Sequence, residues 1–422
     1  MGLIRDRAVV IGQGYVGLPV ALRAVHGGYD VIGFEIDPRK VADLNGGRSH
    51  VEDISPDQLA SMLATGRYRA TSEPEDLAGF DVAVISVPTP MGEGVPDLSF
   101  IESAARTLAP RVSAGSTVIL ESTTYPGTTE ELVAPILEAG SGLTVGEDFH
   151  LGYSPERIDP GNPTWRLENT PKVVSGVDER SLKAVQGFFD RLVDTTVPVS
   201  GTREAELTKL LENTFRHVNI ALVNELAMFA KDLGIDVWEA IDAASTKPFG
   251  YMRFTPGPGV GGHCLPIDPS YLSWQVERSL GQTFRFVELA NDVNQHMTDY
   301  VVRRVQALLN DCRKAVNGSS ILVYGLAYKA NTSDARETPS RPIVEKLQAL
   351  GADVSIIDPH VADPQLPEGA RRSTGTAEEL AAADLVLYLV DHSDFDRDAI
   401  TSAGMPVLDC RRALSGPTVQ FL

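Results

Sequence analysis

The sequence predicts an α/β protein made of two doubly wound domains joined by a long central helix and a helical middle region. A glycine-rich turn follows the first apolar strand at residue 12, which is typical of a nucleotide-binding βαβ unit. The stretch from residue 204 to 233 has no proline or glycine, which predicts the long helix. After residue 311, short apolar strands again alternate with helices. We therefore expect Rossmann-like domains at residues 1–200 and 311–422, with the helical region at residues 201–310.

The bulk composition argues against several classes of partner. The chain has 422 residues, 43% of them hydrophobic, and a net charge of -20. This charge disfavours nucleic acid or an anionic membrane as partner, and no apolar run approaches the length that spans a bilayer. The first strand begins at Ala8, which leaves no room for a signal peptide. Three scattered cysteines provide no disulfide framework, so we expect a reducing, cytoplasmic location.

The first βαβ unit carries a candidate dinucleotide site. The turn Gly12-Gln13-Gly14-Tyr15-Val16-Gly17 follows the first strand, and a second strand at residues 30–34 ends at Glu35. Backbone N–H groups at the start of the helix can bind a pyrophosphate, and Glu35 can accept bonds from the ribose hydroxyls. An acid at this position favours NAD because it repels a 2′-phosphate. We predict cofactor contacts for Gly12, Gly14, Tyr15, Val16, Gly17 and Glu35. Lys40 either contacts the adenosine end or is an ordinary solvated lysine.

Later strands of the first domain end in polar side chains. Strands at residues 81–87 and 116–121 lead to Thr89 and to Ser122-Thr123. We expect these hydroxyls to line the nicotinamide side, because ligands bind past the carboxyl ends of parallel strands. Thr128 is the expected cap of the helix that follows. After a further strand, Glu156 and Arg157 are either an acid–base group and an anion clamp or an ordinary surface pair.

The central region holds the residues that point most directly to chemistry. Lys209 and Asn213 share one face of the long helix, where they either hold a substrate oxygen or belong to a solvated stripe. The glycines and prolines of residues 257–269 predict a rigid loop in place of a helix. This loop can bring Gly259 and Gly261 close to a ligand and present the thiol of Cys264, with Asp268 nearby; the alternative is a turn with a buried cysteine. No second cysteine or histidine lies at ligand spacing from His263-Cys264, so no metal is expected.

The last part of the chain predicts a second doubly wound unit, with strands at residues 320–325, 354–357, 385–390 and 407–408. It lacks the dinucleotide glycine pattern, so we expect a ligand other than NAD. Lys329 and Arg336 lie in the loop after its first strand, where such folds bind ligands.

Together these motifs resemble the UDP-glucose/GDP-mannose dehydrogenase family of nucleotide-sugar 6-dehydrogenases. The resemblance runs from Val9 to about Arg411, and its motifs are Gly12–Gly17, Ser122-Thr123, Ser154–Glu156, Lys209–Asn213, Gly261–Cys264 with Asp268, and Asp334–Glu337. It implies oxidation of the C6 hydroxymethyl of a UDP-hexose to a carboxylate with two NAD⁺, in polysaccharide biosynthesis, by a homodimer paired through the central helices. Residues 125–131, 246–250 and 256–259 are most similar to UDP-N-acetylglucosamine 6-dehydrogenases. UDP-glucose and UDP-N-acetylmannosamine dehydrogenases are the alternatives.

The resemblance also implies roles for the candidate residues. Cys264 would carry a thiohemiacetal and then a thioester, Lys209 and Asn213 would hold the oxyanion, and Asp268 would hold a water. Glu156 and Thr123 would assist proton transfer through water. Arg336 would contact the cofactor, and the last domain would bind the UDP. The sugar nucleotide would contact Glu156, Arg157, Lys209, Asn213, Gly259, Gly261 and Lys329.

Two other functions stay open at the level of sequence. A two-electron hydroxyacid dehydrogenase also joins a Rossmann domain to long helices, but it needs neither Cys264 nor a second α/β unit. A non-catalytic nucleotide-sugar sensor would not need Cys264, Lys209 and Asp268.

Overall fold

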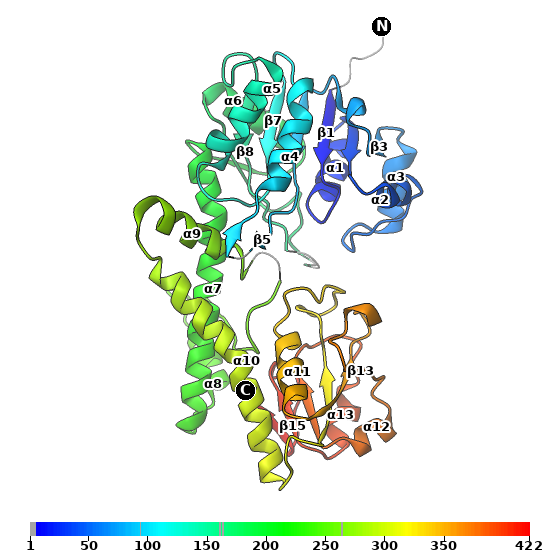
Figure 1. Cartoon of the computed structure of the whole chain (residues 1–422), viewed down its shortest axis with the longest axis vertical. Helices are drawn as coiled ribbons and strands as arrows, with labels where there is room; N and C mark the ends of the chain where they lie inside the picture. The colour runs from blue at the N-terminus through cyan, green and yellow to red at the C-terminus, as the bar shows by residue number, and fades with distance from the viewer. Residues whose placement is uncertain (1–5, 93, 160–161, 163, 263–264) are drawn as a thin grey trace. The chain divides into compact units, whose positions relative to one another are not determined.

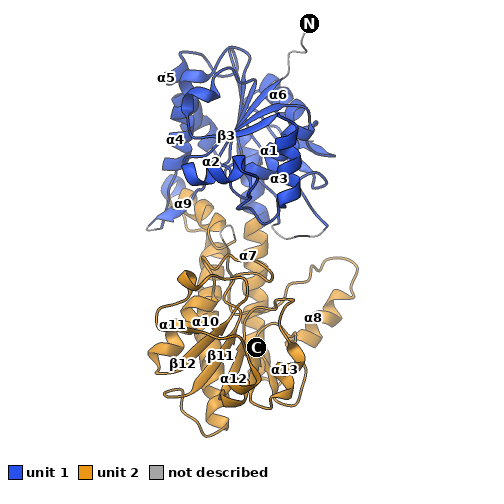
Figure 2. Cartoon of the chain, turned by 90° about the vertical axis from the view of Figure 1, so that its right-hand side faces the viewer, with its two compact units in different colours: residues 1–212, 278–280 blue, residues 213–277, 281–422 orange. Residues whose placement is uncertain are grey.

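The structure is a computed structural model that describes residues 6–92, 94–159, 162, 164–262 and 265–422. The chain forms two compact units, which are coloured separately in Figure 2. The first comprises residues 1–212 with 278–280, and the second comprises residues 213–277 with 281–422. The predicted division into three domains, with boundaries near residues 200 and 310, is not tested by these two units and stays a prediction.

The first unit is a parallel sheet with helices on both faces (Figure 1). Its strands follow the order β3-β2-β1-β4-β7-β8, and neighbouring strands are parallel. The strands are β1 (Arg7–Ile11), β2 (Asp30–Phe34), β3 (Tyr68–Thr71), β4 (Val82–Ile85), β7 (Thr117–Leu120) and β8 (His150–Tyr153). The helices are α1 (Gly17–His26), α2 (Pro38–Asn45), α3 (Pro56–Ala64), α4 (Ser99–Leu108), α5 (Ala134–Ser141) and α6 (Glu179–Phe189). The strand order changes direction between β1 and β4, and in such sheets the ligand binds at that point.

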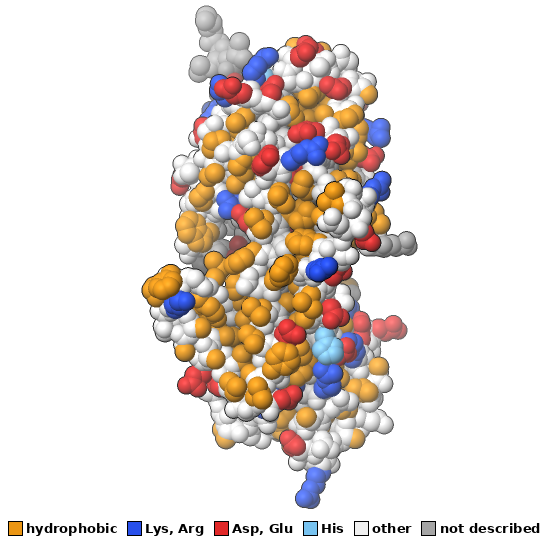
Figure 3. Space-filling view, turned by 90° about the vertical axis from the view of Figure 1, so that its left-hand side faces the viewer, with side chains coloured by type: hydrophobic (Ala, Val, Ile, Leu, Met, Phe, Trp, Pro, Cys, Tyr) orange, Lys and Arg blue, Asp and Glu red, His pale blue; other side chains and the backbone are white. Residues whose placement is uncertain are grey.

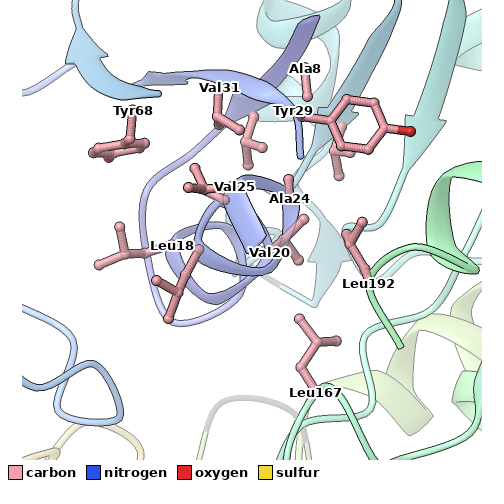
Figure 4. Close-up of a cluster of buried hydrophobic side chains, with 14 of the residues drawn as sticks. Ala8, Leu18, Val20, Ala24, Val25, Tyr29, Val31, Tyr68, Leu167 and Leu192 are labelled. Atoms are coloured by element: carbon pink, nitrogen blue, oxygen red, sulfur yellow. The ribbon is translucent and has the colours of Figure 1, made fainter. Parts of the chain in front are cut away.

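Alternation along the strands explains the two covered faces. Ala8 and Val10 of β1 pack into one hydrophobic cluster, whereas Val9 and Ile11 pack into the other. Figure 4 shows the first cluster, in which Leu18, Val20 and Val25 of α1 lie between the sheet and later segments of the chain. Helix α1 is apolar on nearly all sides because both the sheet and these segments bury it.

Small elements complete the first unit. They are the antiparallel pair β5 (Met91–Gly92) and β6 (Val95–Pro96), the parallel pair β9 (Lys172–Val174) and β10 (Thr196–Pro198), the 3₁₀ helices η1 (Pro74–Leu77) and η2 (Ala109–Arg111), and the π-helical turn η3 (Thr129–Val133).

The second unit repeats the architecture of the first. Its sheet has the order β13-β12-β11-β14-β15-β16 with parallel neighbours, so β11 takes the place of β1. The strands are β11 (Ser320–Tyr324), β12 (Asp353–Ile357), β13 (Arg371–Arg372), β14 (Leu385–Tyr388), β15 (Val407–Asp409) and β16 (Val419–Phe421). The helices are α11 (Ser340–Ala349), α12 (Ala377–Ala382), α13 (Arg397–Ser402) and the 3₁₀ helix η4 (Asp363–Gln365).

Helices connect the two sheets in the sequence (Figure 1). They are α7 (Thr202–Asp232), α8 (Val237–Ser245), α9 (Asp268–Leu280) and α10 (Arg285–Asp311). The first turns of α7 belong to the first unit and the remainder to the second. No helix of the described residues is long and apolar enough to cross a membrane.

The predicted fold class is confirmed, and the main differences lie at element ends. The loop predicted at residues 257–269 ends earlier than expected, because Asp268 and Pro269 form the first turn of α9. Proline is tolerated there since the first N–H groups of a helix have no partner within it. The edge strands β3, β13 and β16 were not among the expected strands, because short edge strands carry little apolar pattern.

Candidate functional site

The glycine turn after β1 has one open position and two crowded ones. Gly12 has a φ of +87°, and its N–H donates to the carbonyl of Phe34 at 2.9 Å. A Cβ atom on Gly17 would lie 1.8 Å from the carbonyl oxygen of Gly12. A Cβ atom on Gly14 would meet nothing within 4 Å among the described residues. Gly12 and Gly17 are therefore required by the fold, whereas the open face of Gly14 leaves room for a ligand.

The surroundings of this turn fit the pyrophosphate and ribose of a dinucleotide. In the described part of the chain no side chain caps α1, so the N–H groups at its start can bind a phosphate. The Glu35 carboxylate is buried and accepts from the backbone N–H of Gln13 at 3.3 Å and of Asp37 at 3.2 Å. Tyr15 and Val16 are half-buried, and Lys40 is exposed on α2.

Ser122 joins the ends of two neighbouring strands. Its hydroxyl donates to the carbonyl of Val87 at 2.9 Å and accepts from the N–H of the same residue at 2.9 Å. Thr89 and Thr123 are half-buried in the loops after β4 and β7. The three residues thus follow the carboxyl ends of these strands, and the hydroxyl of Ser122 supports the loop; their contact with the nicotinamide stays a prediction.

The first unit brings Glu156 and Lys209 together. The ammonium of Lys209 donates to the backbone carbonyl of Glu156 at 2.7 Å and lies 3.3 Å from its Oε2. Oε1 of Glu156 accepts from the N–H of Ile158. Both side chains are at most 10% exposed, so their attraction is screened far less than that of a surface pair. The side chain of Lys209 is therefore buried and does not belong to a solvated stripe of the helix.

Arg157 clamps the loop that carries Glu156. Its Nη2 and Nε donate to the two carboxylate oxygens of Glu212 at 2.6 and 3.3 Å, and its Nη1 donates to the carbonyl of Pro171 at 2.6 Å. This arrangement is a bidentate ion pair, which fixes orientation as well as distance. All three guanidinium nitrogens thus donate hydrogen bonds to other groups of the protein. The predicted contact of Arg157 with the sugar stays a prediction.

Glu206 holds the turn after β7, a role that sequence reasoning did not assign. Its carboxylate accepts from the N–H of Gly127 at 2.6 Å and from the N–H and hydroxyl of Thr129 at 2.9 and 2.7 Å. Burial raises the pKa of Glu206 to about 7, against the lowering effect of these bonds. Thr128 was wrong as the expected cap: its hydroxyl donates to the carbonyl of Tyr125 and makes no cap hydrogen bond among the described residues, and Glu206 of α7 binds the N–H groups on either side of it. Residues 77 positions apart make this contact, so no local pattern signals it.

The second unit pairs Asn213 with Asp268. The amide Nδ2 of Asn213 donates to Oδ2 of Asp268 at 2.5 Å, and both side chains are at most 6% exposed. Asp268 is the first residue of α9, where a carboxylate is favoured by the helix dipole. The cysteine of the same loop, Cys264, lies outside the described residues, as does His263.

The glycine–proline loop is anchored to the helices of the second unit. The N–H of Gly257 donates to Oδ1 of Asn224 at 2.9 Å, and Nδ2 of Asn224 donates to Oδ1 of Asn294 at 2.9 Å. A Cβ atom on Gly261 would lie 2.8 Å from the ring of Pro339, and Gly259 has a φ of +135°. Both glycines are thus required for the path of the loop, whether or not they contact a ligand.

The second sheet has an acid, Asp358, at the position that corresponds to Glu35, and residues of the same unit donate hydrogen bonds to it. Gly325 follows β11 with a φ of +93° and donates to the carbonyl of Ile357, as Gly12 donates to Phe34. The next residue, Asp358, accepts from the N–H groups of Leu326 and Ala327 at 2.7 and 2.9 Å, and from the buried His392 at 3.1 Å. Burial raises the pKa of Asp358, but these bonds outweigh it and hold the pKa at about 2. A carboxylate occupied in this way does not offer a ribose the acceptor that Glu35 offers.

Lys329 and Arg336 follow β11 in the same unit. Lys329 is half-buried, and Arg336 forms a bidentate pair with Asp334 at 2.8 and 2.9 Å. Arg336 also lines a cavity of about 630 Å³, together with His217, Asn291 and Arg341. Burial lowers the pKa of His217, whose Nε2 lies 2.8 Å from Oδ1 of Asn291. Two arginines and an imidazole thus line part of this cavity, beside proline and alanine side chains.

Comparison with known proteins identifies the parts of the chain. Models of the UDP-glucose/GDP-mannose dehydrogenase family match in order: the NAD binding domain over residues 6–193, the central domain over residues 203–296 and the UDP binding domain over residues 322–416. The chain is 35% identical to the UDP-N-acetyl-D-mannosamine dehydrogenase of Pyrococcus horikoshii, over 99% of this chain and 98% of that protein. It is 36% identical to the enzyme of the same name from Escherichia coli K12, over 92% of this chain and 93% of that one. The solved structure of the Pyrococcus horikoshii enzyme has a TM-score of 0.90 at 34% identity and covers 99% of this chain and 98% of its own.

Paired glycine substitutions separate folding from cofactor binding in this turn. Gly17→Ala forces a Cβ atom against the Gly12 carbonyl and is expected to lower the free energy of unfolding by ~1–3 kcal/mol or more. Gly14→Ala is expected to leave that free energy within ~0.5 kcal/mol and to weaken NAD binding at least ~10-fold. Urea unfolding and NAD titration by calorimetry measure the two effects. Full NAD affinity in the Gly14→Ala protein would contradict the placement of the pyrophosphate.

Proposed function

Because the chain belongs to the UDP-glucose/GDP-mannose dehydrogenase family, we propose that it oxidises the C6 hydroxymethyl of UDP-N-acetylmannosamine to a carboxylate with two NAD⁺. The chain is an NAD-dependent nucleotide-sugar dehydrogenase, an oxidoreductase that acts on CH–OH groups. The choice of sugar rests on the two relatives named for UDP-N-acetylmannosamine, each at least 35% identical over most of both chains. These relatives favour that alternative over the UDP-N-acetylglucosamine suggested by the loop residues.

The oxidation requires two hydride transfers and a covalent step between them. Bound NAD⁺ supplies the hydride acceptor. The alcohol carbon loses a hydride and its hydroxyl loses a proton, which leaves an aldehyde. The Cys264 thiolate then adds to the aldehyde carbon, and the resulting thiohemiacetal can lose a second hydride to become a thioester. Water cleaves the thioester, which releases the carboxylate and restores the thiolate. Cys264 is assigned here by the resemblance of its motif.

Lys209 stabilises the negative charge of the alkoxide, and Glu156 accepts the proton that the hydroxyl loses. A buried ammonium stabilises a developing oxyanion more strongly than one in water, because little solvent screens it. The ammonium 3.3 Å away balances the charge of the Glu156 carboxylate until that carboxylate accepts the proton through water, which leaves the ammonium to balance the alkoxide. Thr123, at the end of β7, would orient that water.

In the second unit, Asn213 orients the carboxylate of Asp268, whose role is to hold the water that cleaves the thioester. Lys329 would contact the sugar through its ammonium, and Arg336 would contact the cofactor. Gly259 and Gly261 would let the loop backbone approach the sugar.

We further infer that the active protein is a homodimer paired through its central helices. On α7 the side chains of Phe215, Leu222, Leu226 and Phe229 are each 45–53% exposed. Figure 3 shows hydrophobic side chains gathered on the face of the molecule where the long helices lie. Large exposed apolar patches of this kind mark interaction surfaces.

Stoichiometry tests the proposed reaction. With limiting UDP-N-acetylmannosamine and excess NAD⁺, we expect two NADH for each sugar consumed, because the same carbon is oxidised twice. Absorbance at the NADH band and chromatography of the sugar nucleotide provide the two amounts.

The same assay separates the competing functions. One NADH for each sugar would indicate a two-electron dehydrogenase, and none with any sugar nucleotide would indicate a sensor. Higher kcat/KM with UDP-N-acetylglucosamine or UDP-glucose than with UDP-N-acetylmannosamine would overturn the choice of sugar but not the reaction.

The thiol has a test of its own. In Cys264→Ser we expect the reaction to stop after the first oxidation, with at most one NADH for each active site and a trapped aldehyde or covalent adduct visible by intact-protein mass spectrometry. The exposed Cys312 provides the control, since Cys312→Ser should leave the rate unchanged. Undiminished formation of the uronate by Cys264→Ser would reject the role assigned to Cys264.

A further inference from the structure

The first unit contains a second buried ion pair that the proposed chemistry does not use. The ammonium of Lys172 contacts Oε1 of Glu121, and neither side chain is more than 2% exposed. Glu121 directly follows β7, and Lys172 is the first residue of β9. A buried charge is retained only when it is paired and hydrogen-bonded, so each partner requires the other.

Lys172 also holds the loop that carries Glu156. Its ammonium donates to the carbonyl of Pro155 at 2.9 Å, whereas Lys209 donates to the carbonyl of Glu156 at 2.7 Å. Two successive carbonyls are thus each bound by an ammonium from a different element. Since the proline ring already restricts φ of Pro155, these bonds set the orientation of the peptide between Pro155 and Glu156.

The pair also joins this loop to the strand end that carries Thr123. Glu121 immediately precedes Ser122, whose hydroxyl is bonded to the loop after β4. Burial raises the pKa of Glu121, although the charges of Lys172 and Lys209 lower it. The Phe189 ring lies 5.0 Å from the Lys172 ammonium and helps to keep water away. The two carboxylates and two ammoniums therefore share one buried region.

We propose that Lys172 is a positioning residue for the oxidation: through Pro155 it holds Glu156 in the orientation that meets Lys209, and Glu121 holds Lys172 in place. This inference rests on the proposed function, because it takes Glu156 and Lys209 as the groups that act on the sugar. The competing explanation is that Lys172 only neutralises Glu121 and thereby stabilises the fold.

A pair of variants distinguishes positioning from neutralisation. In Lys172→Met, Glu121 is left buried without its partner and the Pro155 carbonyl loses its donor, so we expect both Tm and kcat to fall. In Glu121→Leu with Lys172→Met, no unpaired charge is left, so we expect Tm to recover. Because the Pro155 contact is still missing, kcat should stay ~10²-fold below the wild-type value. The change should appear in kcat more than in KM, since Glu156 acts on the proton of the reacting hydroxyl and not on the nucleotide.

Matched controls complete the experiment. Lys183→Met removes an exposed lysine: the side chain of Lys183 is 71% exposed, and that of its ion-pair partner Glu179 is 79% exposed. This substitution should change neither Tm nor kcat. Lys172→Arg keeps a cation with several N–H donors and should regain part of the lost kcat. If the double variant recovers kcat together with Tm, Lys172 only neutralises Glu121 and the inference is overturned.

Failure of this inference can be told from failure of the proposed function. Lys209→Met and Glu156→Gln, measured in parallel, must both lose most of kcat for the site to be correct. If they stay active, the assignment of the reaction to Glu156 and Lys209 fails. If they are inactive while the double variant is fully active, only the positioning role of Lys172 fails.

Discussion

The arrangement of the first unit depends on the need to pair buried charges. Glu121, Glu156, Lys172 and Lys209 come from four separate segments, and each side chain is at most 10% exposed. Removing one partner of such a pair typically costs ~3–5 kcal/mol, because the other charge is left without compensation. These ion pairs thereby fix the relative positions of four segments: the ends of β7 and β8, the start of β9 and the first turns of α7. A cation and a carboxylate are thus positioned before any substrate arrives, which is the condition for electrostatic catalysis.

The two units show how one fold is adapted to two ligands. Both have the same strand order, a glycine with positive φ after the first strand and an acid after the second. In the first unit Glu35 accepts two long backbone bonds of 3.2 and 3.3 Å, which suits an acceptor for ribose. In the second unit Asp358 accepts from the backbone and from His392, so the same position serves to hold the loop of Lys329. The NAD and UDP binding domains of the family correspond to these two arrangements.

Local patterns in the sequence were sufficient for much of this architecture. The glycine turn, Glu35 and α7 could be predicted because they depend on spacing within one or two elements. The roles of Lys172, Glu206 and Asn224 could not, since their partners lie 51, 77 and 70 residues away and a charge beside an apolar strand usually faces water. Thr128 failed as a cap because its hydroxyl donates to the carbonyl of Tyr125 and the N–H of Glu131 donates to the carbonyl of Gly127, while a carboxylate from a distant helix binds the N–H groups on either side of Thr128. The identity of the sugar could not be predicted from local patterns either, because a few loop side chains decide between isomers at C2.

The central claim is that Glu156 and Lys209 act on the sugar as one unit, and a double-mutant cycle tests it most directly. Values of kcat would be measured for Glu156→Gln, Lys209→Met and the protein with both changes, with NADH release as the signal. If the two groups act together, the double variant should be hardly slower than the worse of the single variants. Losses that multiply in the double variant would mean that the two groups act independently, and would contradict this account.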